Sequence, residues 1–166
     1  MKKSIPFFLL IFFSSCIGLS HIAQTSGLNE DDLSLIPKDA SEVIIEKDIP
    51  ALEMYNEIYS SLLLRGHRID KDDKERYYIT TEGKDVGQST LQRSTIVINE
   101  NNGTSKAIIR SEWKPGTTAT MGASMFAGIA LSTDWEQAKW ETGRPGIAFA
   151  EGYSIAKSVN GKVSFR

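Results

Sequence analysis

The sequence predicts an α+β domain with a mostly antiparallel sheet and helices packed on one face, preceded by a signal peptide and a flexible tether. Three observations lead to this prediction. An uncharged apolar run stands near the start of the chain, and a polar segment without periodicity follows it. From residue 41 onward, strand-like runs are interrupted and followed by helix-like periodic segments, an order typical of the α+β class.

Length and composition fit one soluble-type domain. The chain has 166 residues, of which 40% are hydrophobic and 24% are charged, as in ordinary globular proteins. Once Lys2 and Lys3 leave with the signal peptide, 17 Lys and Arg face 21 Asp and Glu, so the net charge is −4. Nucleic-acid binding depends on a positive surface that releases counterions from phosphates. We therefore expect no nucleic-acid partner.

Residues 1–15 have the three-part plan of a secretory signal peptide. Lys2 and Lys3 form the positive region, residues 5–13 are an apolar run, and the small residues Ser14 and Ser15 follow. A retained transmembrane helix is the alternative interpretation, but spanning a bilayer takes about 20 apolar residues. This run offers nine, so we predict export.

Cys16 is the predicted site of lipid attachment. The residues Phe13-Ser14-Ser15-Cys16 resemble the bacterial lipoprotein box, with Phe13 where Leu is more usual. A single cysteine cannot form an internal disulfide, and a thioether-linked lipid explains its presence in an oxidising compartment. The alternative is cleavage after Gly18-Leu19-Ser20, which discards the cysteine and gives a soluble periplasmic or secreted protein. The sequence favours a protein anchored by lipid to the outer or inner membrane and facing the periplasm.

The remainder divides into a tether and one domain. Residues 16–40 carry the anchor cysteine and then a polar, turn-prone stretch, so we predict a flexible tether there and a single α+β domain over residues 41–166. Residues 41–47 predict the first strand. Residues 50–65 predict a helix that starts near Pro50 and stops at Gly66. Its predicted apolar face consists of Leu52, Tyr55, Ile58, Tyr59, Leu62 and Leu63.

Three further strands are predicted over residues 77–82, 94–99 and 105–113, which are rich in β-branched and aromatic residues. The last two form a predicted hairpin, because Asn102-Gly103 tolerates the left-handed backbone angles of a tight turn. We expect loops over residues 70–75 and 83–92. The charge-free, small-residue segment 117–132 is too short and too polar for a membrane span, so we expect a strand or loop covered by the domain.

Two helices are predicted in the last third of the chain. Thr133 and Glu136 form a capping box, which predicts a short helix. Pro145 opens a second helix, which Asn160-Gly161 closes before a terminal strand over residues 163–165. Its buried face is predicted to contain Ile147, Ala148, Phe149, Tyr153, Ile155 and Val159.

A resemblance follows from the segment between Ser41 and Trp113. Its aromatic-bearing helix ends in Leu-Arg-Gly-His-Arg-Ile, followed by an Asp-rich turn and Tyr-Tyr-Ile-Thr-Thr. In these features it resembles the small TATA-binding-protein-like α+β modules of bacterial envelope lipoproteins, such as that of the lipoprotein C component of the outer-membrane β-barrel assembly machinery. The resemblance covers about half of the chain by element order and residue type. It implies the α+β fold and transfers no functional residue.

The sequence offers little material for catalysis or metal binding. His21 and His67 are the only histidines, and we expect His67 to face solvent or to cap the helix before it. Zinc ligands are not clustered, and in the Asp-rich segment from Asp70 onward Glu75 stands where a calcium loop has glycine and Thr81 where it has its bidentate glutamate. We therefore predict no catalytic residues, no metal site and no cofactor.

The tryptophans point to a binding function instead. Trp135 and Trp140 lie five residues apart on one predicted short helix, so one of them is expected to be exposed in a groove, although core packing is the simpler alternative for each. The leading hypothesis is a non-catalytic binding or assembly module. Its expected partners are the membrane, through the lipid, and an envelope protein. The alternatives are a small hydrolase that uses scattered carboxylates and a protein that binds a small apolar ligand.

Overall fold

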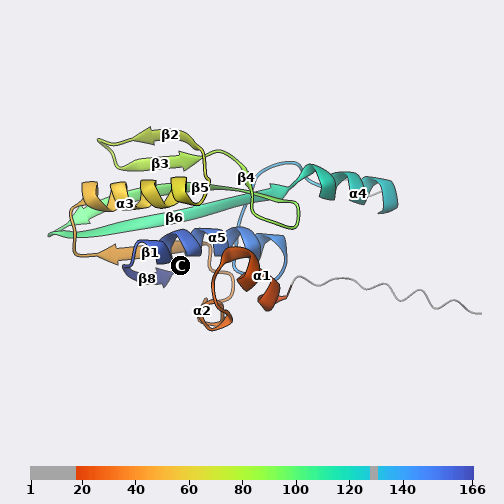
Figure 1. The fold of residues 1–166 in the computed structure, drawn as a ribbon, viewed down its shortest axis with the longest axis horizontal. Helices are drawn as coiled ribbons and strands as arrows, with labels where there is room; N and C mark the ends of the chain where they lie inside the picture. Colours follow the sequence, from red (N-terminus) through yellow and green to blue (C-terminus); the bar gives the residue numbers. More distant parts are fainter. Residues whose placement is uncertain (1–17, 128–130) are drawn as a thin grey trace, which may run out of the picture.

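The computed structural model describes residues 18–127 and 131–166 (Figure 1). The predicted signal peptide and Cys16 lie outside the described residues. The helices are α1 (Leu19–Ser26), α2 (Glu30–Ser34), α3 (Ala51–Leu64), α4 (Thr117–Ala127) and α5 (Arg144–Ser158). The strands are β1 (Glu42–Lys47), β2 (Ile69–Asp73), β3 (Tyr78–Thr81), β4 (Lys84–Asp85), β5 (Thr90–Asn101), β6 (Thr104–Pro115), β7 (Glu136–Gln137) and β8 (Lys162–Phe165).

All of the described strands join one antiparallel sheet. The order along the sheet is β2-β3-β5-β6-β1-β8, with the short strands β4 and β7 added to β5 and β6. Every pairing is antiparallel. After β1 the chain crosses through α3 to β2 at the far edge of the sheet, so β1 lies between β6 and β8. The predicted α+β class with an antiparallel sheet is confirmed.

The β5–β6 hairpin is the longest feature of the sheet. Its twelve-residue strands are paired from Thr90 with Pro115 to Asn101 with Thr104. Only Asn102 and Gly103 remain for the turn, and their φ angles are +51° and +80°. Two successive positive φ angles define the tight hairpin turn whose twist suits the flanking strands. The predicted hairpin is confirmed, although β5 begins four residues before its predicted start. Strand β4 and the beginning of β5 therefore occupy part of the predicted loop 83–92.

Helices α3 and α5 lie side by side on one face of the sheet (Figure 1). Ile96 and Ile98 of β5 point to this face and are buried, whereas the intervening Val97 is half-buried on the other face. Gly152 allows α5 to approach β6 closely, because an added Cβ there would lie 2.6 Å from the Ser111 hydroxyl oxygen. The predicted one-sided packing of helices is thus confirmed, as are the predicted start and apolar face of α5.

Helix α3 is confirmed, but its buried face is rotated from the predicted one. Leu52 is 42% exposed and Leu63 is 51% exposed, while Met54 and Ser61 are buried. The buried positions are Ala51, Met54, Tyr55, Ile58, Ser61 and Leu62. They follow the three-and-four spacing of one narrow helix stripe. Apolar residues also stand beside this stripe in the sequence, and packing against the sheet selects which of them are buried.

The prediction of a flexible tether over residues 16–40 is wrong for its described part. Helices α1 and α2 pack on the domain, and Ile22, Leu33 and Ile36 are at most 5% exposed. Asn29 caps α2 by accepting a hydrogen bond from the backbone N–H of Asp32 at 2.6 Å. Such short helices are stabilised by tertiary contacts rather than by local propensity, so their sequences show no sustained period. The folded unit therefore includes α1 and α2.

Three local predictions in the rest of the chain are also wrong. The charged residues of the predicted loop 70–75 belong largely to β2, an edge strand, where charged side chains deter further strand pairing. Segment 117–132 contains helix α4 instead of a covered strand or loop. Residues after Thr133 form β7 instead of a helix, because Glu136 and Gln137 pair with the edge of β6 left free at Trp113 and Glu112.

Replacing Ile22 with alanine tests whether α1 is part of the core. Because Ile22 is 1% exposed, we expect Ile22→Ala to lower the free energy of unfolding by about 2–4 kcal/mol. Urea denaturation followed by circular dichroism measures this change. Leu35→Ala is the matched control, since Leu35 is 74% exposed, and should change stability by less than about 0.5 kcal/mol. Equal, small effects of both substitutions would show that this segment is a loose tether after all.

Candidate functional site

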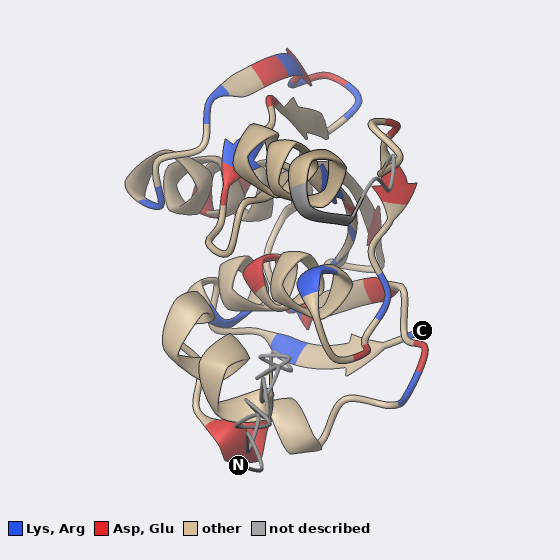
Figure 2. Ribbon diagram, turned by 90° about the vertical axis from the view of Figure 1, so that its right-hand side faces the viewer, with Lys and Arg blue, Asp and Glu red and all other residues tan. Residues whose placement is uncertain are grey.

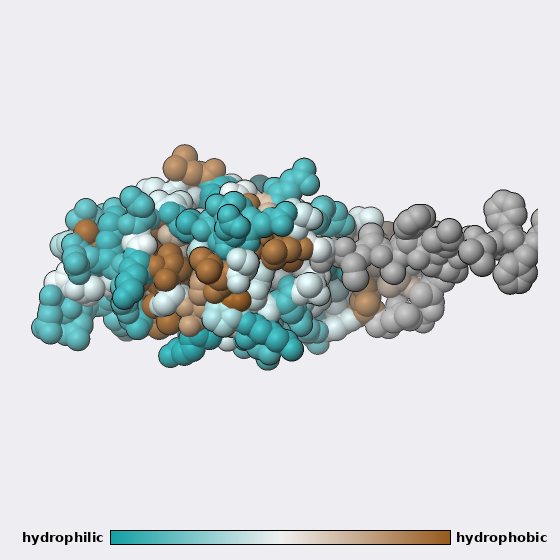
Figure 3. Space-filling view, turned by 90° about the horizontal axis from the view of Figure 1, so that it is seen from below, coloured by the Kyte–Doolittle hydropathy of each residue, from teal (hydrophilic) through white to brown (hydrophobic). Residues whose placement is uncertain are grey.

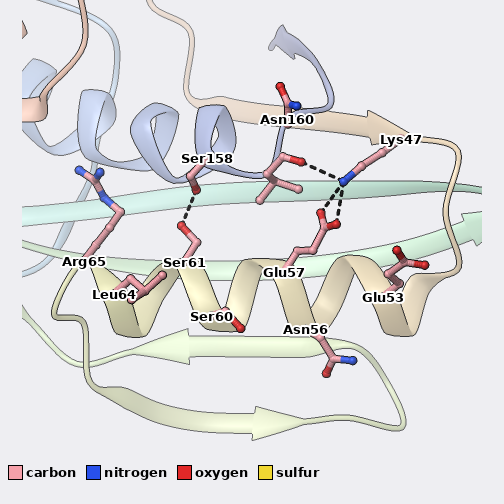
Figure 4. Close-up of a pocket in the computed structure, with 11 residues that line it drawn as sticks. Lys47, Glu53, Asn56, Glu57, Ser60, Ser61, Leu64, Arg65, Ser158 and Asn160 are labelled. Carbon is pink, nitrogen blue, oxygen red and sulfur yellow. Dashed lines mark hydrogen bonds and ion pairs between the residues drawn. The ribbon is translucent and has the colours of Figure 1, made fainter.

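A groove runs between α3 and the C-terminal end of α5, with β1 at one end (Figure 4). Its volume is about 640 Å³. Helix α3 contributes most of the wall because successive turns present every third or fourth residue to the same side. The lining residues are Lys47, Glu53, Asn56, Glu57, Ser60, Ser61, Leu64, Arg65, Ser158, Val159 and Asn160.

The buried side of the groove is internally paired. Lys47 donates to both carboxylate oxygens of Glu57 at 2.7 Å and to the carbonyl oxygen of Val159 at 3.1 Å. The hydroxyls of Ser61 and Ser158 contact each other, and Ser158 also donates to the carbonyl oxygen of Ile155. These contacts tie α3, α5 and β1 together. They use the Lys47 charge and both hydroxyls for structure.

On the outer side of the groove, some polar side chains make no hydrogen bond to the other lining residues. Figure 4 shows no interaction that joins Asn56, Ser60 or Asn160 to the other lining residues. Leu64 is 89% exposed at the end of α3. An exposed leucine beside amide and hydroxyl groups offers an apolar contact and hydrogen bonds to the same ligand. The arrangement suits binding of a peptide-like surface.

Arg65 connects this groove to a buried carboxylate. Glu151 of α5 is 4% exposed, and Arg65 Nη2 lies 2.7 Å from its Oε2. His67 Nε2 and Lys84 Nζ lie 2.9 and 3.1 Å from Oε1. Burial alone raises the pKa of Glu151, but the hydrogen bonds from His67 and Arg65 and the charges of Arg65 and Lys84 outweigh it and hold the pKa well below its usual value. Glu151 is therefore an ionised carboxylate at neutral pH.

His67 was expected to face solvent or to cap α3. Its backbone N–H does cap α3, by donating to the carbonyl oxygen of Leu62 at 2.9 Å, but its side chain does not face solvent. Its residue exposure is 2%, and its Nδ1 has no hydrogen-bond partner within the described residues. The chain turns inward after Gly66, so the ring lies beneath α5 and meets Glu151, 84 residues later in the chain. No local pattern signals this pairing. The buried Glu within an otherwise apolar face of α5 was the one available clue.

Trp135 lies on the face of the sheet that α3 and α5 do not cover. Its neighbour Arg93 stands between the buried residues Gln92 and Ser94 and so points to the opposite face. The Arg93 guanidinium carbon lies 4.6 Å from the Trp135 ring centroid, and Lys114 Nζ lies 4.8 Å from it. These are cation–π distances. Trp135 is half-buried and closely approached by Gly83.

Trp140 lies elsewhere, on the helix side of the sheet. Its ring centroid is 6.0 Å from that of Phe149 on α5, and its backbone N–H donates to the carbonyl oxygen of Ala40 at 2.7 Å. The prediction that the two tryptophans share one short helix is wrong, because β7 separates them in an extended segment. They face different surfaces and cannot form a common groove.

Trp140 does line a separate apolar crevice of about 480 Å³. Leu19 and Ile22 of α1, together with Ile36, contribute its other apolar walls. Figure 3, which views the lower edge of the molecule in Figure 1, shows apolar atoms gathered between hydrophilic rims on this face. A crevice of this chemistry can accept an apolar group. It was missed in the sequence because residues 17–40 carried no helical pattern.

Two properties of the described ranges 18–127 and 131–166 bear on the remaining predictions. Within them no helix has the length and apolar character needed to cross a bilayer. In the same residues no group of three or more His, Cys, Asp or Glu side chains is placed to hold a metal ion.

Comparison with known proteins gives a distant structural likeness. No protein-family model matches the chain, and no curated protein matches it. The chain is similar to a DUF4468 family protein from Bacteroides ovatus whose crystal structure is known. The two share 13% sequence identity with a TM-score of 0.37, over 76% of this chain and 91% of that one.

The buried charge cluster makes a pH-dependent contribution to stability. Because the folded state lowers the pKa of Glu151, its ionised form stabilises the fold fully above the unfolded pKa of about 4.3. This stabilisation is lost as the pH falls below that value toward the folded pKa. We expect Glu151→Gln to lower the free energy of unfolding at pH 7 by about 3 kcal/mol. The difference from the wild type should shrink as the pH is lowered through 4.

Chemical denaturation at a series of pH values measures this difference. Glu53→Gln is the control, because Glu53 is exposed on α3, and it should change stability by less than about 0.5 kcal/mol at pH 7. A Glu151→Gln effect that stays constant to pH 3 would mean that the lost charge is not its cause.

Proposed function

We propose that this chain is a lipid-anchored, non-catalytic envelope protein that binds a protein partner through the groove between α3 and α5. The observation that carries the proposal is Leu64, which is 89% exposed at a groove of about 640 Å³ whose inner polar groups are already paired. Because the walls of the groove are already held in place and Leu64 is already exposed, little reorganisation is needed for a partner to bind.

The chemistry of the groove favours binding over turnover. Ser61 and Ser158 contact each other, and the second of them donates to a backbone carbonyl oxygen, so neither hydroxyl is oriented by a base. The nearest strongly perturbed acid, Glu151, is kept ionised by the charges of Arg65 and Lys84 and by a hydrogen bond with His67. That environment suits a structural anion rather than a proton donor.

The start of α1 supports processing before Cys16. Helix α1 begins at Leu19, with Gly18 as its N-cap residue, and Leu19 packs against the core. Cleavage after Ser20, the alternative site, would remove the first two residues of this helix. Processing before Cys16 leaves α1 complete and leaves a cysteine at the new N-terminus for acylation.

Substitution of Leu64 tests the groove. We expect Leu64→Glu to weaken partner binding about tenfold or more, since burying a leucine contributes about 1.5–3 kcal/mol. A photo-crosslinking amino acid at Ser60 in the native host, followed by mass spectrometry of the adduct, measures partner contact. The adduct should disappear with Leu64→Glu and persist with the control Leu35→Glu, whose leucine is also exposed. Equal adducts in both backgrounds would argue against this groove.

Substitution of Cys16 tests the anchor. We expect the wild-type protein to carry a diacyl or triacyl mass increment on Cys16 and to sediment with membranes. Cys16→Ser should abolish both the increment and the sedimentation. Intact-mass measurement and membrane fractionation give both results. A mature protein that begins at His21 without added lipid would instead establish the soluble alternative.

A further inference from the structure

The folded unit begins almost at the proposed anchor. Helix α1 starts at Leu19, and its Ile22 is 1% exposed in the core. Cys16 precedes Gly18 by two residues, which span at most about 7 Å when extended. A bilayer that holds acyl chains on Cys16 therefore lies close to the first turn of α1. The domain cannot stand away from the membrane as it would on a 24-residue tether.

Helix α4 projects from the same end of the molecule. In Figure 1 it continues from the end of β6 beyond the sheet, on the same right-hand side as the beginning of α1. The tip of the β5–β6 hairpin lies at the opposite, left-hand end. Figure 2 looks at the right-hand end and shows no Lys, Arg, Asp or Glu on either α1 or α4. Helices α1 and α4 are thus uncharged, whereas α2, which packs against α1, carries Glu30, Asp31 and Asp32.

The surface of α4 is suited to an apolar environment. Met121 is 57% exposed and Met125 is 78% exposed, and their four-residue spacing places them on one face of the helix. The Thr120 hydroxyl donates to the carbonyl oxygen of Gly116 at 3.0 Å, and the Ser124 hydroxyl donates to that of Met121 at 3.2 Å. Polar groups already bonded within the helix lose little when they leave water. Flexible methionine side chains adapt to irregular apolar surroundings.

We propose that α4 inserts its methionine-bearing face into the interface of the bilayer that holds the acyl chains of Cys16, and so fixes the orientation of the domain on the membrane. This inference rests on the proposed lipidation of Cys16. A second membrane contact beside an acyl anchor strengthens attachment and limits rotation about it. Because α1 and α4 carry no charge, the contact is apolar and its strength does not depend on salt.

An environment-sensitive fluorophore on α4 tests the proposal in the intact lipidated protein. Acylation consumes the thiol of Cys16, the only cysteine in the sequence, so Met125→Cys supplies a unique thiol for labelling with nitrobenzoxadiazole. With phosphatidylcholine vesicles we expect the emission maximum to move to shorter wavelength and the intensity to rise several-fold, equally at low and high salt. The same label at Asn101→Cys, which is exposed near the hairpin tip, should keep the emission maximum and intensity of a label in water.

The possible outcomes separate the two proposals. Vesicle-bound protein whose label at position 125 remains in water overturns membrane insertion of α4 and leaves the lipid anchor intact. A shift that occurs without vesicles and grows with protein concentration identifies a second copy of the chain as the occupant of α4, which also overturns the proposal. Protein that lacks an acyl mass and does not bind vesicles overturns the anchor and this inference with it.

Discussion

The ionised carboxylate of Glu151 is the interaction on which the rest of the structure depends. Taking a charge out of water is costly unless it is paired and hydrogen-bonded. Here Arg65, His67 and Lys84 supply the pairing. Arg65 also donates to the carbonyl oxygen of Ser26 at 3.3 Å, and Lys84 donates to that of Arg65 at 2.6 Å. One buried charge therefore fixes α5, the end of α3, strand β4 and the end of α1 relative to each other.

This arrangement explains why the candidate binding features lie where they do. The face of the sheet opposite α3 and α5 carries cross-strand ion pairs, with Arg93–Glu112 at 2.6 Å, Arg110–Glu42 at 2.7 Å and Lys106–Glu46 at 3.2 Å. These pairs keep that face hydrated, so the helices gather on the other one. The groove forms where α3 and α5 meet, and Arg65 links its wall to Glu151. Any ligand in the groove would therefore contact a wall whose position is set by the buried charges around Glu151.

The features that sequence analysis predicted correctly are those with a local physical cause. Asn102 and Gly103 accept positive φ angles, which made the β5–β6 hairpin predictable. Pro145 and the apolar spacing of α5 likewise act within a few residues. The candidate site was largely missed, because Glu151 and His67 are 84 residues apart and His67 looks like a solvent-facing residue in its own segment. Trp140 was named together with Trp135 as a possible binding surface, but the residues that line its crevice, Leu19 and Ile36, were assigned to a tether.

The sequence by itself determined an α+β chain, a long antiparallel hairpin and two amphipathic helices, and it predicts an export signal with Lys2 and Lys3 before an apolar run. Local backbone preference and hydrophobic period suffice for those features. Only the tertiary structure decided that α1 and α2 belong to the core, which stripe of α3 is buried, and that segment 117–127 is an exposed helix. Each of these depends on contacts between distant segments, whose packing energy outweighs the weak preferences of short stretches of chain.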